Sequence, residues 1–553
     1  MSVDDLLLPG TVRQAVPAGI DVSAAARKLV SGLVAEPYGQ VSASVYETGR
    51  LVSQAPWLTG HTGRVAFLLG AQRPDGGWGA PGGYALVPTL SATEALIAEL
   101  RRDDPGSGLG REDVGRGADR GLELLRSWSR DGRWPSPPDM PAIELIVPAL
   151  VSLINEHLAA AGAGERLDLP QGMDGAKLSV IRERLASGAA VSQKLVHALE
   201  VAGEAAVRAP GVVPSPVGTD TFSPVAAGTI GASPAAGSAW LGPEGRADPD
   251  DPVRRYLEAV AGRYGGPVPC ALPVTVFERG WVLSWLWRAG IHVEVPPQLA
   301  ESLGDALGPQ GTSAGPGLPP DADTTSVALY ALALLGDPRE PDGLRGYETD
   351  THFCTWRGEE GASPTVNAHV LDAFGEYVRR RPEAAPRYAA ATGRLSAWLR
   401  GRQTREGSWL DRWHASPYYA TACCALALAE FGGEESAEAV DGAVRWILGS
   451  QREDGSWGRW RGTAEETAYA LQTLLLTAAT AGRGRAEAVE RGYHYLRGSV
   501  GDQGVPIGAP PLWHDKDLYL PVAIVTAAVL GALHLARPVT RSRPGGVGAI
   551  TDS

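Results

Sequence analysis

The sequence predicts an all-α fold, chiefly because one phrase recurs along the chain. Residues 72–79 read QRPDGGWG, residues 403–409 read QTREGSW and residues 451–458 read QREDGSWG, with a degenerate copy, SRDGRW, at 129–134. In each copy Asp-Gly or Glu-Gly supplies the positive-φ turn that ends a helix, and the tryptophan can pack between neighbouring helices. Helical apolar patterns flank most copies, whereas alternating β-branched runs with hairpin turns are few.

The spacing of the copies predicts how the helices are grouped. Trp409 and Trp457 stand one helical hairpin apart, at 48 residues, which is typical of a stacked array of helix pairs. The copies fall into two groups, around 72–134 and 403–457, and 553 residues are too many for one core. We therefore expect two helical barrels, with breaks in the Pro/Gly-rich stretches 209–252 and 308–320 and a frayed tail from 537.

Composition and charge exclude several classes of protein. The net charge of −13 argues against nucleic acid and anionic membranes as partners. The chain has no run of eighteen apolar residues and its first residues do not resemble a secretory signal, so we expect no membrane insertion. Four cysteines without metal-ligand spacing indicate a cytoplasmic location.

The most informative segment is DADTT at residues 321–325, which follows a Gly/Pro loop and precedes an apolar run. A carboxyl group in a low dielectric resists ionisation, so its pKa rises and it can stay protonated at neutral pH. Facing a dry cavity, such an acid could protonate a carbon–carbon double bond. The alternative is a helix N-terminus, where Asp and Thr cap free backbone N–H groups.

Several further segments, in order, resemble the bacterial class II terpene cyclases, which cyclise linear prenyl diphosphates. They are SVYETGR at 44–50, PVTVFER at 273–279, TVNAH at 365–369, DRWHASPYY at 411–419, EETAY at 465–469 and LWHDKDLY at 512–519. The resemblance extends from about residue 37 onward. Within this family the chain resembles both the drimenyl and the copalyl diphosphate synthases.

The resemblance implies two α/α barrels, called β and γ, with the active site between them. The γ barrel of this family is inserted after the first helix of the β barrel. We therefore expect an N-terminal segment with the first β-barrel helix at 1–37, the γ barrel at 38–261, the rest of the β barrel at 262–536 and a flexible tail at 537–553.

The resemblance also assigns the acid. The middle Asp of the family's DxDD motif corresponds to Asp323, with Asp321 as a second carboxylate. Thr365 and His369 are four residues apart, so on a helix they share one face. We expect both to hold Asp323 through hydrogen bonds, although a satisfied core histidine is the simpler interpretation of His369 taken alone.

A carbocation formed by protonation needs aromatic faces around it. The candidates are Trp281, Trp285, Trp356, Trp413, Tyr418 and Tyr419. No Asp-Asp pair is followed by the DDxxD pattern of enzymes that ionise the diphosphate, so we expect the diphosphate to be retained. The resemblance implies Mg²⁺, with Glu144 near the metal and Lys177, Lys194 or Lys516 on phosphate oxygens, although solvated surface is the simpler interpretation of any single lysine.

Thr324 stands where most of the family has a third Asp, as in the DxDTT variant of drimane-forming cyclases. On that basis we expect farnesyl diphosphate as the substrate and a drimenyl-type diphosphate as the product. Geranylgeranyl diphosphate giving a copalyl- or labdane-type diphosphate remains open. Two further alternatives are a squalene-type cyclase and a non-catalytic α/α toroid that serves as a binding module; the sequence gives no oligomeric state.

Overall fold

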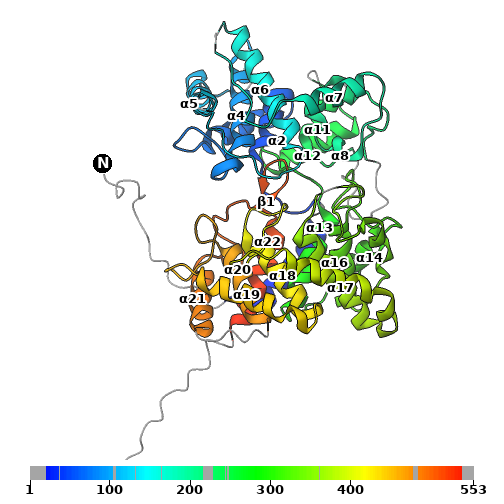
Figure 1. Ribbon diagram of the computed structural model, residues 1–553. Helices are drawn as coiled ribbons and strands as arrows, with labels where there is room; N and C mark the ends of the chain where they lie inside the picture. The colour runs from blue at the N-terminus through cyan, green and yellow to red at the C-terminus, as the bar shows by residue number, and fades with distance from the viewer. Residues whose placement is uncertain are drawn as a thin grey trace, which may run out of the picture.

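The protein consists of two helical bodies, one above the other in Figure 1. The computed structural model describes residues 20–537 except 37, 104–107, 131, 163–164, 216–227, 243–244, 246–247, 360 and 478–483. The only strands of the described residues, β1 (Trp513–His514) and β2 (Leu518–Tyr519), form an antiparallel hairpin. The predicted all-α fold is confirmed.

The upper body, which corresponds to the γ barrel, is built from eleven consecutive α-helices of the described residues. They are α2 (Val45–Gln54), α3 (His61–Gly70), α4 (Leu86–Leu100), α5 (Arg111–Arg130), α6 (Ile143–Ala160), α7 (Ala176–Ala186), α8 (Gln193–Val196), α9 (Leu199–Ala202), α10 (Glu204–Val207), α11 (Pro234–Leu241) and α12 (Pro252–Arg263), with the 3₁₀ helix η2 (Gly82–Ala85). The boundary expected at residue 261 therefore falls inside α12, two residues before its end.

The lower body, which corresponds to the β barrel, contains the remaining helices. They are α13 (Thr275–Arg288), α14 (Pro297–Ala306), α15 (Ala322–Leu334), α16 (Pro364–Arg380), α17 (Ala385–Gly401), α18 (Pro417–Phe431), α19 (Ala437–Gly449), α20 (Ala464–Leu476), α21 (Arg485–Gly498) and α22 (Val522–Ala536), with η3 (Pro341–Tyr347), η4 (Pro382–Ala384) and η5 (Glu434–Ser436). The first helix, α1 (Val22–Ala35), packs against α13 and α22 of this body. Residues 1–19 and 538–553, including nearly all of the expected tail, lie outside the described residues.

The three intact repeats make the same contacts, which explains the phrase. The indole N–H groups of Trp78, Trp409 and Trp457 donate to carbonyls ten residues earlier, at 2.6, 2.8 and 2.8 Å, which ties each turn to the helix that it ends. All three rings are fully buried, and the glycine of each turn has a positive φ. In the degenerate copy the buried indole nitrogen of Trp134 has no hydrogen-bond partner among the described residues. The repeat is therefore a structural turn.

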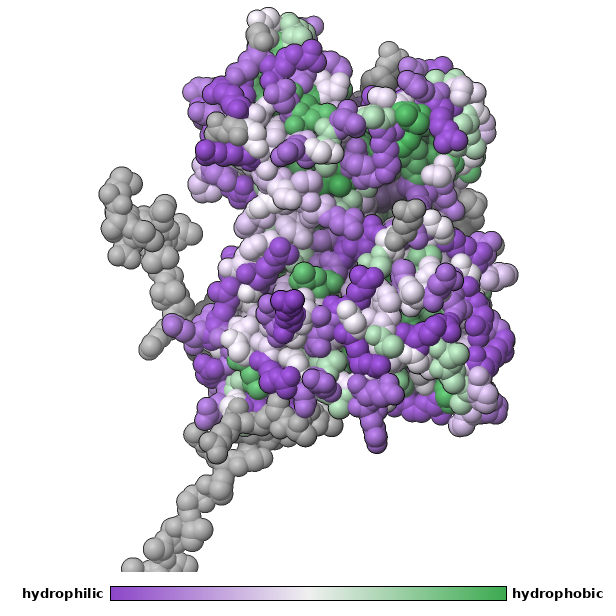
Figure 2. Space-filling model, in the orientation of Figure 1, coloured by the Kyte–Doolittle hydropathy of each residue, from purple (hydrophilic) through white to green (hydrophobic). Residues whose placement is uncertain are grey.

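Only α6 among the described helices is long and apolar enough to cross a membrane by length and composition, and 61% of that segment is buried within the protein. Its side chains belong to the core of the upper body. On the face shown in Figure 2 the surface is mainly hydrophilic, with small separate apolar patches. Scattered apolar residues of this kind are normal for globular proteins. The cytoplasmic location remains a prediction.

A buried ionic cluster at the junction holds the two bodies together. Lys516, between β1 and β2, is fully buried, and its Nζ donates to Glu200 at 2.9 Å and to the Ser233 hydroxyl at 2.8 Å, and also pairs with Glu47. Next to it, Asp517 accepts hydrogen bonds from the start of α2. Since Glu47, Glu200 and Ser233 belong to the upper body, this cluster fixes the position of one barrel on the other.

Candidate active site

A cavity of about 770 Å³ lies between the two bodies and is lined by both. Its apolar wall comes from the upper body through residues such as Leu145, Ile181 and Leu195, and from the lower body through Val274 and Phe277. Its volume lies in the range of small-molecule sites, roughly 300–1,000 Å³. The DADTT segment lines this cavity through Asp321, Asp323 and Thr324.

The two interpretations of DADTT, a helix cap and an acid facing a cavity, apply to different residues: Asp321 is the cap and Asp323 faces the cavity. Asp321 is the N-cap of α15, because its Oδ1 accepts the backbone N–H of Thr324 at 2.6 Å. Burial raises the pKa of Asp321 to about 8; the hydrogen bond from Thr324 opposes this rise and the charge of Asp323 adds to it. The cap therefore stays protonated at neutral pH, and Asp323 follows in the first helical turn.

Asp323 and His369 form a close pair at the floor of the cavity. Oδ1 of Asp323 lies 2.6 Å from Nδ1 of His369 on α16. Burial alone would lower the pKa of His369, but the adjacent Asp323 carboxylate outweighs burial and holds that pKa well above its usual value. His369 therefore carries a proton on Nδ1 and donates it to Oδ1. The second oxygen of Asp323 is left for the cavity, and this side chain is 17% exposed against 8% for His369.

Thr365 lies on the same face of α16 but belongs to a neighbouring network, so the predicted hydrogen bond to Asp323 is replaced. Its backbone N–H donates to Asp411 Oδ1 at 3.1 Å, and its hydroxyl lies 3.2 Å from that of Ser363. Asp411 also accepts the Trp413 N–H at 2.8 Å. This partly buried carboxylate, which the sequence did not single out, orders the loop that places Trp413 on the cavity.

The predicted aromatic residues divide into two layers. Trp356 and Trp413 line the cavity and pack edge to face, with ring centroids 5.1 Å apart. Phe277 and Tyr519 also line it, although the sequence did not select them. Both stand in the segments quoted for the family resemblance, which is the signal that could have found them.

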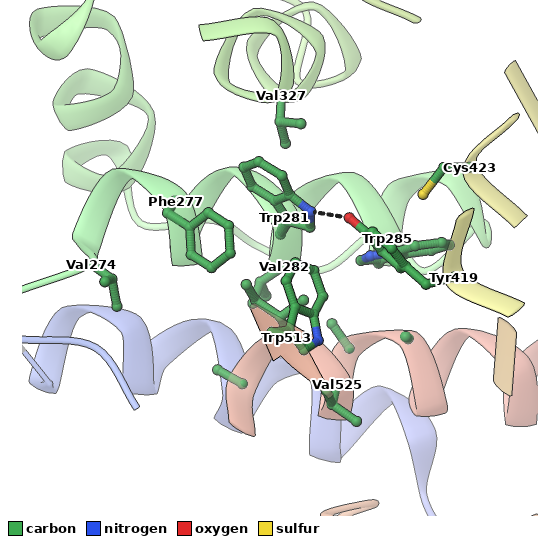
Figure 3. Close-up of a cluster of buried hydrophobic side chains, with 14 of the residues drawn as sticks. Val274, Phe277, Trp281, Val282, Trp285, Val327, Tyr419, Cys423, Trp513 and Val525 are labelled. Carbon is green, nitrogen blue, oxygen red and sulfur yellow. Dashed lines mark hydrogen bonds between the residues drawn. The ribbon is translucent and has the colours of Figure 1, made fainter. Parts of the chain in front are cut away.

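Trp281, Trp285, Tyr418 and Tyr419 do not line this cavity, contrary to expectation. Trp281 lies one turn beyond Phe277 on α13, with ring centroids 4.4 Å apart, and its indole N–H donates to the Tyr419 hydroxyl at 2.9 Å (Figure 3). Trp285 packs against Tyr469, and Tyr418 packs against Trp446. Because α13 is buried on most sides, only one of its aromatic positions reaches the cavity, and the deeper residues support that wall.

Four cationic side chains line the cavity: Lys177, Arg184, Lys194 and Arg412. Lys194 Nζ lies 4.5 Å from the centre of the Trp356 ring, and burial lowers the pKa of this lysine. Arg412 pairs with Glu359 at 2.6 Å. A diphosphate in the cavity would meet these groups.

Lys516 is not among the cavity-lining residues, and its predicted role on phosphate is corrected. Besides its contacts with Glu47, Glu200 and Ser233, its Nζ donates to the carbonyl of His197 at 2.8 Å. The side chain is fully buried and all donors of the ammonium group are engaged. Its charge serves the junction between the barrels.

Mg²⁺, which the family resemblance implies, would have to share its coordination with the substrate. Glu144 lines the cavity, is 43% exposed and pairs with Lys177. Across the described part of the chain, no three His, Cys, Asp or Glu side chains are grouped to hold a metal ion. Mg²⁺ commonly takes one or two carboxylates and completes its coordination with water and substrate phosphates, so Glu144 fits such a site.

Two helical barrels with a carboxylic acid–histidine pair facing an aromatic cavity between them define a class II terpene cyclase. Residues 360–506 match the Squalene-hopene cyclase C-terminal domain. The chain is 43% identical to Ent-copalyl diphosphate synthase of Streptomyces sp. (strain KO-3988), covering 92% of this chain and 95% of that protein. It is 38% identical to Labda-7,13-dienyl diphosphate synthase of Streptomyces clavuligerus, covering 94% and 93%.

Among solved structures, the ent-copalyl diphosphate synthase from Streptomyces platensis superimposes with a TM-score of 0.87 at 43% identity, covering 93% of this chain and 99% of that one. The ent-copalyl diphosphate synthase from Arabidopsis thaliana, at 17% identity and a TM-score of 0.54, shares the fold. The chain belongs to the class II terpene cyclases and is an enzyme. The alternative of a non-catalytic toroid is therefore excluded.

Proposed function

We propose that the protein is a diterpene cyclase that converts geranylgeranyl diphosphate into a copalyl- or labdane-type bicyclic diphosphate and keeps the diphosphate on the product. The Asp323–His369 pair on the cavity carries this proposal for the chemistry. The relatives support it for the substrate, since they are named for copalyl and labdadienyl diphosphates. The farnesyl expectation is not confirmed, and Thr324 alone is too small a difference to outweigh the relatives. These names also favour a diphosphate over squalene.

In the proposed reaction Asp323 gives the proton on its free oxygen to the terminal double bond, and a tertiary carbocation forms. As the O–H bond breaks, the N–H of His369 on Oδ1 stabilises the carboxylate that is left. The charge then moves through the ring closures between Trp356, Trp413 and Phe277, whose faces attract a cation. The final bicyclic cation loses a proton to a base, which makes the copalyl-type product an isomer of the substrate, and Asp323 regains its proton from solvent. The apolar wall excludes water, which would otherwise capture the cation early.

The other end of the substrate is held at the cationic side of the cavity. Lys194 and Arg412 lie on the wall that also carries Trp356, so binding the diphosphate there brings the prenyl chain to the aromatic faces. Bound Mg²⁺ would neutralise charge on the diphosphate, with Glu144 as its protein ligand. Lys177, now paired with Glu144, can bind a phosphate oxygen in the same region.

Incubation of the purified protein with geranylgeranyl and farnesyl diphosphate separately, with Mg²⁺, tests the proposal. Products are extracted before and after phosphatase treatment and identified by mass spectrometry. We expect a bicyclic C20 alcohol only after phosphatase, and a higher kcat/KM for geranylgeranyl diphosphate. A higher kcat/KM for farnesyl diphosphate, or a hydrocarbon without phosphatase, would overturn the proposal.

A further inference from the structure

A second, much smaller cavity lies behind the catalytic pair. It has a volume of about 20 Å³ and is lined by residues of α13, α15, α16 and α18 of the lower body. His369 lines this small cavity and Asp323 lines the large one, so the pair stands between the two. A volume of about 10–15 Å³ is enough for one water molecule if two to four polar partners surround it.

The polar lining of the small cavity contains groups that lack partners. The Oγ of Ser284 and the Nε of Arg288 are both buried and have no hydrogen-bond partner among the described residues. Buried polar groups in proteins are nearly always hydrogen-bonded to protein or to ordered water. Ser284 and Arg288 are four residues apart on α13, so they lie on the same side of the helix and can share one partner.

The lining also includes Asp372, one turn beyond His369 on α16. Asp372 Oδ1 accepts a hydrogen bond from the Arg288 guanidinium at 2.6 Å, and the same Arg288 nitrogen lies 3.5 Å from Glu430. Because Nδ1 of His369 is engaged with Asp323, Nε2 is the nitrogen that faces the small cavity, where the Cys423 side chain also hydrogen-bonds to His369. The site therefore offers one water two donors and two acceptors.

We propose that this cavity is a structural water site that positions the catalytic histidine. The water accepts hydrogen bonds from His369 Nε2–H and Arg288 Nε–H, and donates to Ser284 Oγ and to the Asp372 carboxylate. With an acceptor at each nitrogen, His369 remains an imidazolium that donates to Asp323 and never competes for its proton. The water site is argued from the cavity alone; only the reaction that His369 serves rests on the proposed function.

The charges around His369 agree with an imidazolium. Asp372 lies one turn away on the same helix and favours a charged ring, and Arg288 offsets part of its charge. Asp323 favours the imidazolium in the same way whenever it is ionised, between giving up one proton and taking up the next. Burial raises the pKa of the Cys423 thiol and of the Tyr419 hydroxyl, so both stay neutral. The titratable and charged groups around the ring and the small cavity are Asp323 and Tyr330 from α15, Asp372 from α16, Arg288 from α13, and Cys423, Tyr419 and Glu430 from α18.

The first test is Ser284→Val, which removes an acceptor and fills the cavity. Without the water, Nε2–H keeps only the weak acceptor Cys423 Sγ. The pKa of His369 then falls, so activity is lost at a lower pH. We expect kcat to fall at least tenfold at pH 8, KM to change less than twofold, and the alkaline limb of kcat against pH to move down by about one unit. Ser284→Ala leaves room for the water and three partners, so a smaller shift is expected.

Ser396→Val on α17 is the matched control, because this buried serine donates to the carbonyl of Thr392 within its own helix, outside the small cavity. If Ser284→Val keeps the wild-type pH profile, whether or not kcat falls, the proposal is overturned and Ser284 serves packing alone.

A crystal structure of the wild-type protein gives a second check. We expect electron density for a water within hydrogen-bond distance of Ser284 Oγ and Arg288 Nε, and the absence of such density would contradict the site. The crystallographic result is independent of the substrate, so failure of the proposed function is distinguishable.

Discussion

Two buried networks of opposite charges lie close to the junction of the barrels, and they differ in one respect. In the junction cluster, Lys516 contacts Glu47, Glu200, Ser233 and a carbonyl, and the side chain is fully buried. In the acid pair, Asp323 contacts His369 through one oxygen and lines the cavity with the rest of its carboxyl group. A saturated network fixes structure, whereas a network with one free position facing a cavity can do chemistry.

The largest expected effect is on activity, from Asp323→Asn in the acid pair. The amide keeps the shape of the carboxyl group but has no proton acidic enough for an alkene, so turnover should fall by about 10³-fold or more. The rate of cyclisation under saturating substrate measures it, and the melting temperature should stay close to that of the wild type. A loss smaller than about tenfold would remove Asp323 from the role of acid.

The next effect is on stability, from Lys516→Met in the junction cluster. Removing the ammonium group leaves Glu47 and Glu200 buried without a counter-charge, which costs about 3–5 kcal/mol in the free energy of unfolding. Denaturant unfolding followed by circular dichroism measures the change. Lys177→Met is the control, because its pair with Glu144 is largely exposed and should contribute about 0–1 kcal/mol. Equal losses of unfolding free energy in the two variants would show that the buried contacts of Lys516 do not stabilise the junction cluster.

The smallest effect is a pH dependence of stability, from Asp321→Asn beside the acid. The folded-state pKa of Asp321, about 8, lies above its ordinary value, so the protonated cap stabilises the fold fully at low pH and this contribution is lost as pH rises toward 8. The wild type should therefore lose about 1–3 kcal/mol relative to Asp321→Asn between pH 5 and pH 7. Free energies of unfolding at the two pH values measure it. A constant difference would show that Asp321 is ionised in the folded protein.

Much of the fold and the core of the site could be predicted from the sequence. The repeats predict their own contacts because the turn, the glycine and the tryptophan are adjacent in the chain. The spacing of Thr365 and His369 predicts a shared helix face, and the family resemblance predicts that this face meets the acid of DADTT; the structure places His369 on Asp323.

The remaining site residues depend on contacts between distant segments, which no local pattern records. In sequence, a lysine that binds phosphate looks the same as one that pairs with buried carboxylates. Lys516 belongs to the second kind, because its partners Glu47 and Glu200 lie more than 300 residues away. The depth of Trp281 could not be predicted, since α13 is buried on most sides and its apolar pattern does not show which side meets the cavity. Thr365 was expected on Asp323, but Asp411 binds its backbone from another loop.

The measurement that tests the account most directly is cyclisation in D₂O followed by mass spectrometry of the product. If Asp323 starts the reaction with an exchangeable proton, each product molecule acquires one deuterium on the carbon that was protonated and still carries its diphosphate. Protonation by Asp323 therefore gives a dephosphorylated product one mass unit heavier than that formed in H₂O, with no free pyrophosphate released. A product without deuterium, accompanied by stoichiometric pyrophosphate, would show that ionisation of the diphosphate starts the reaction and that Asp323 is not its acid.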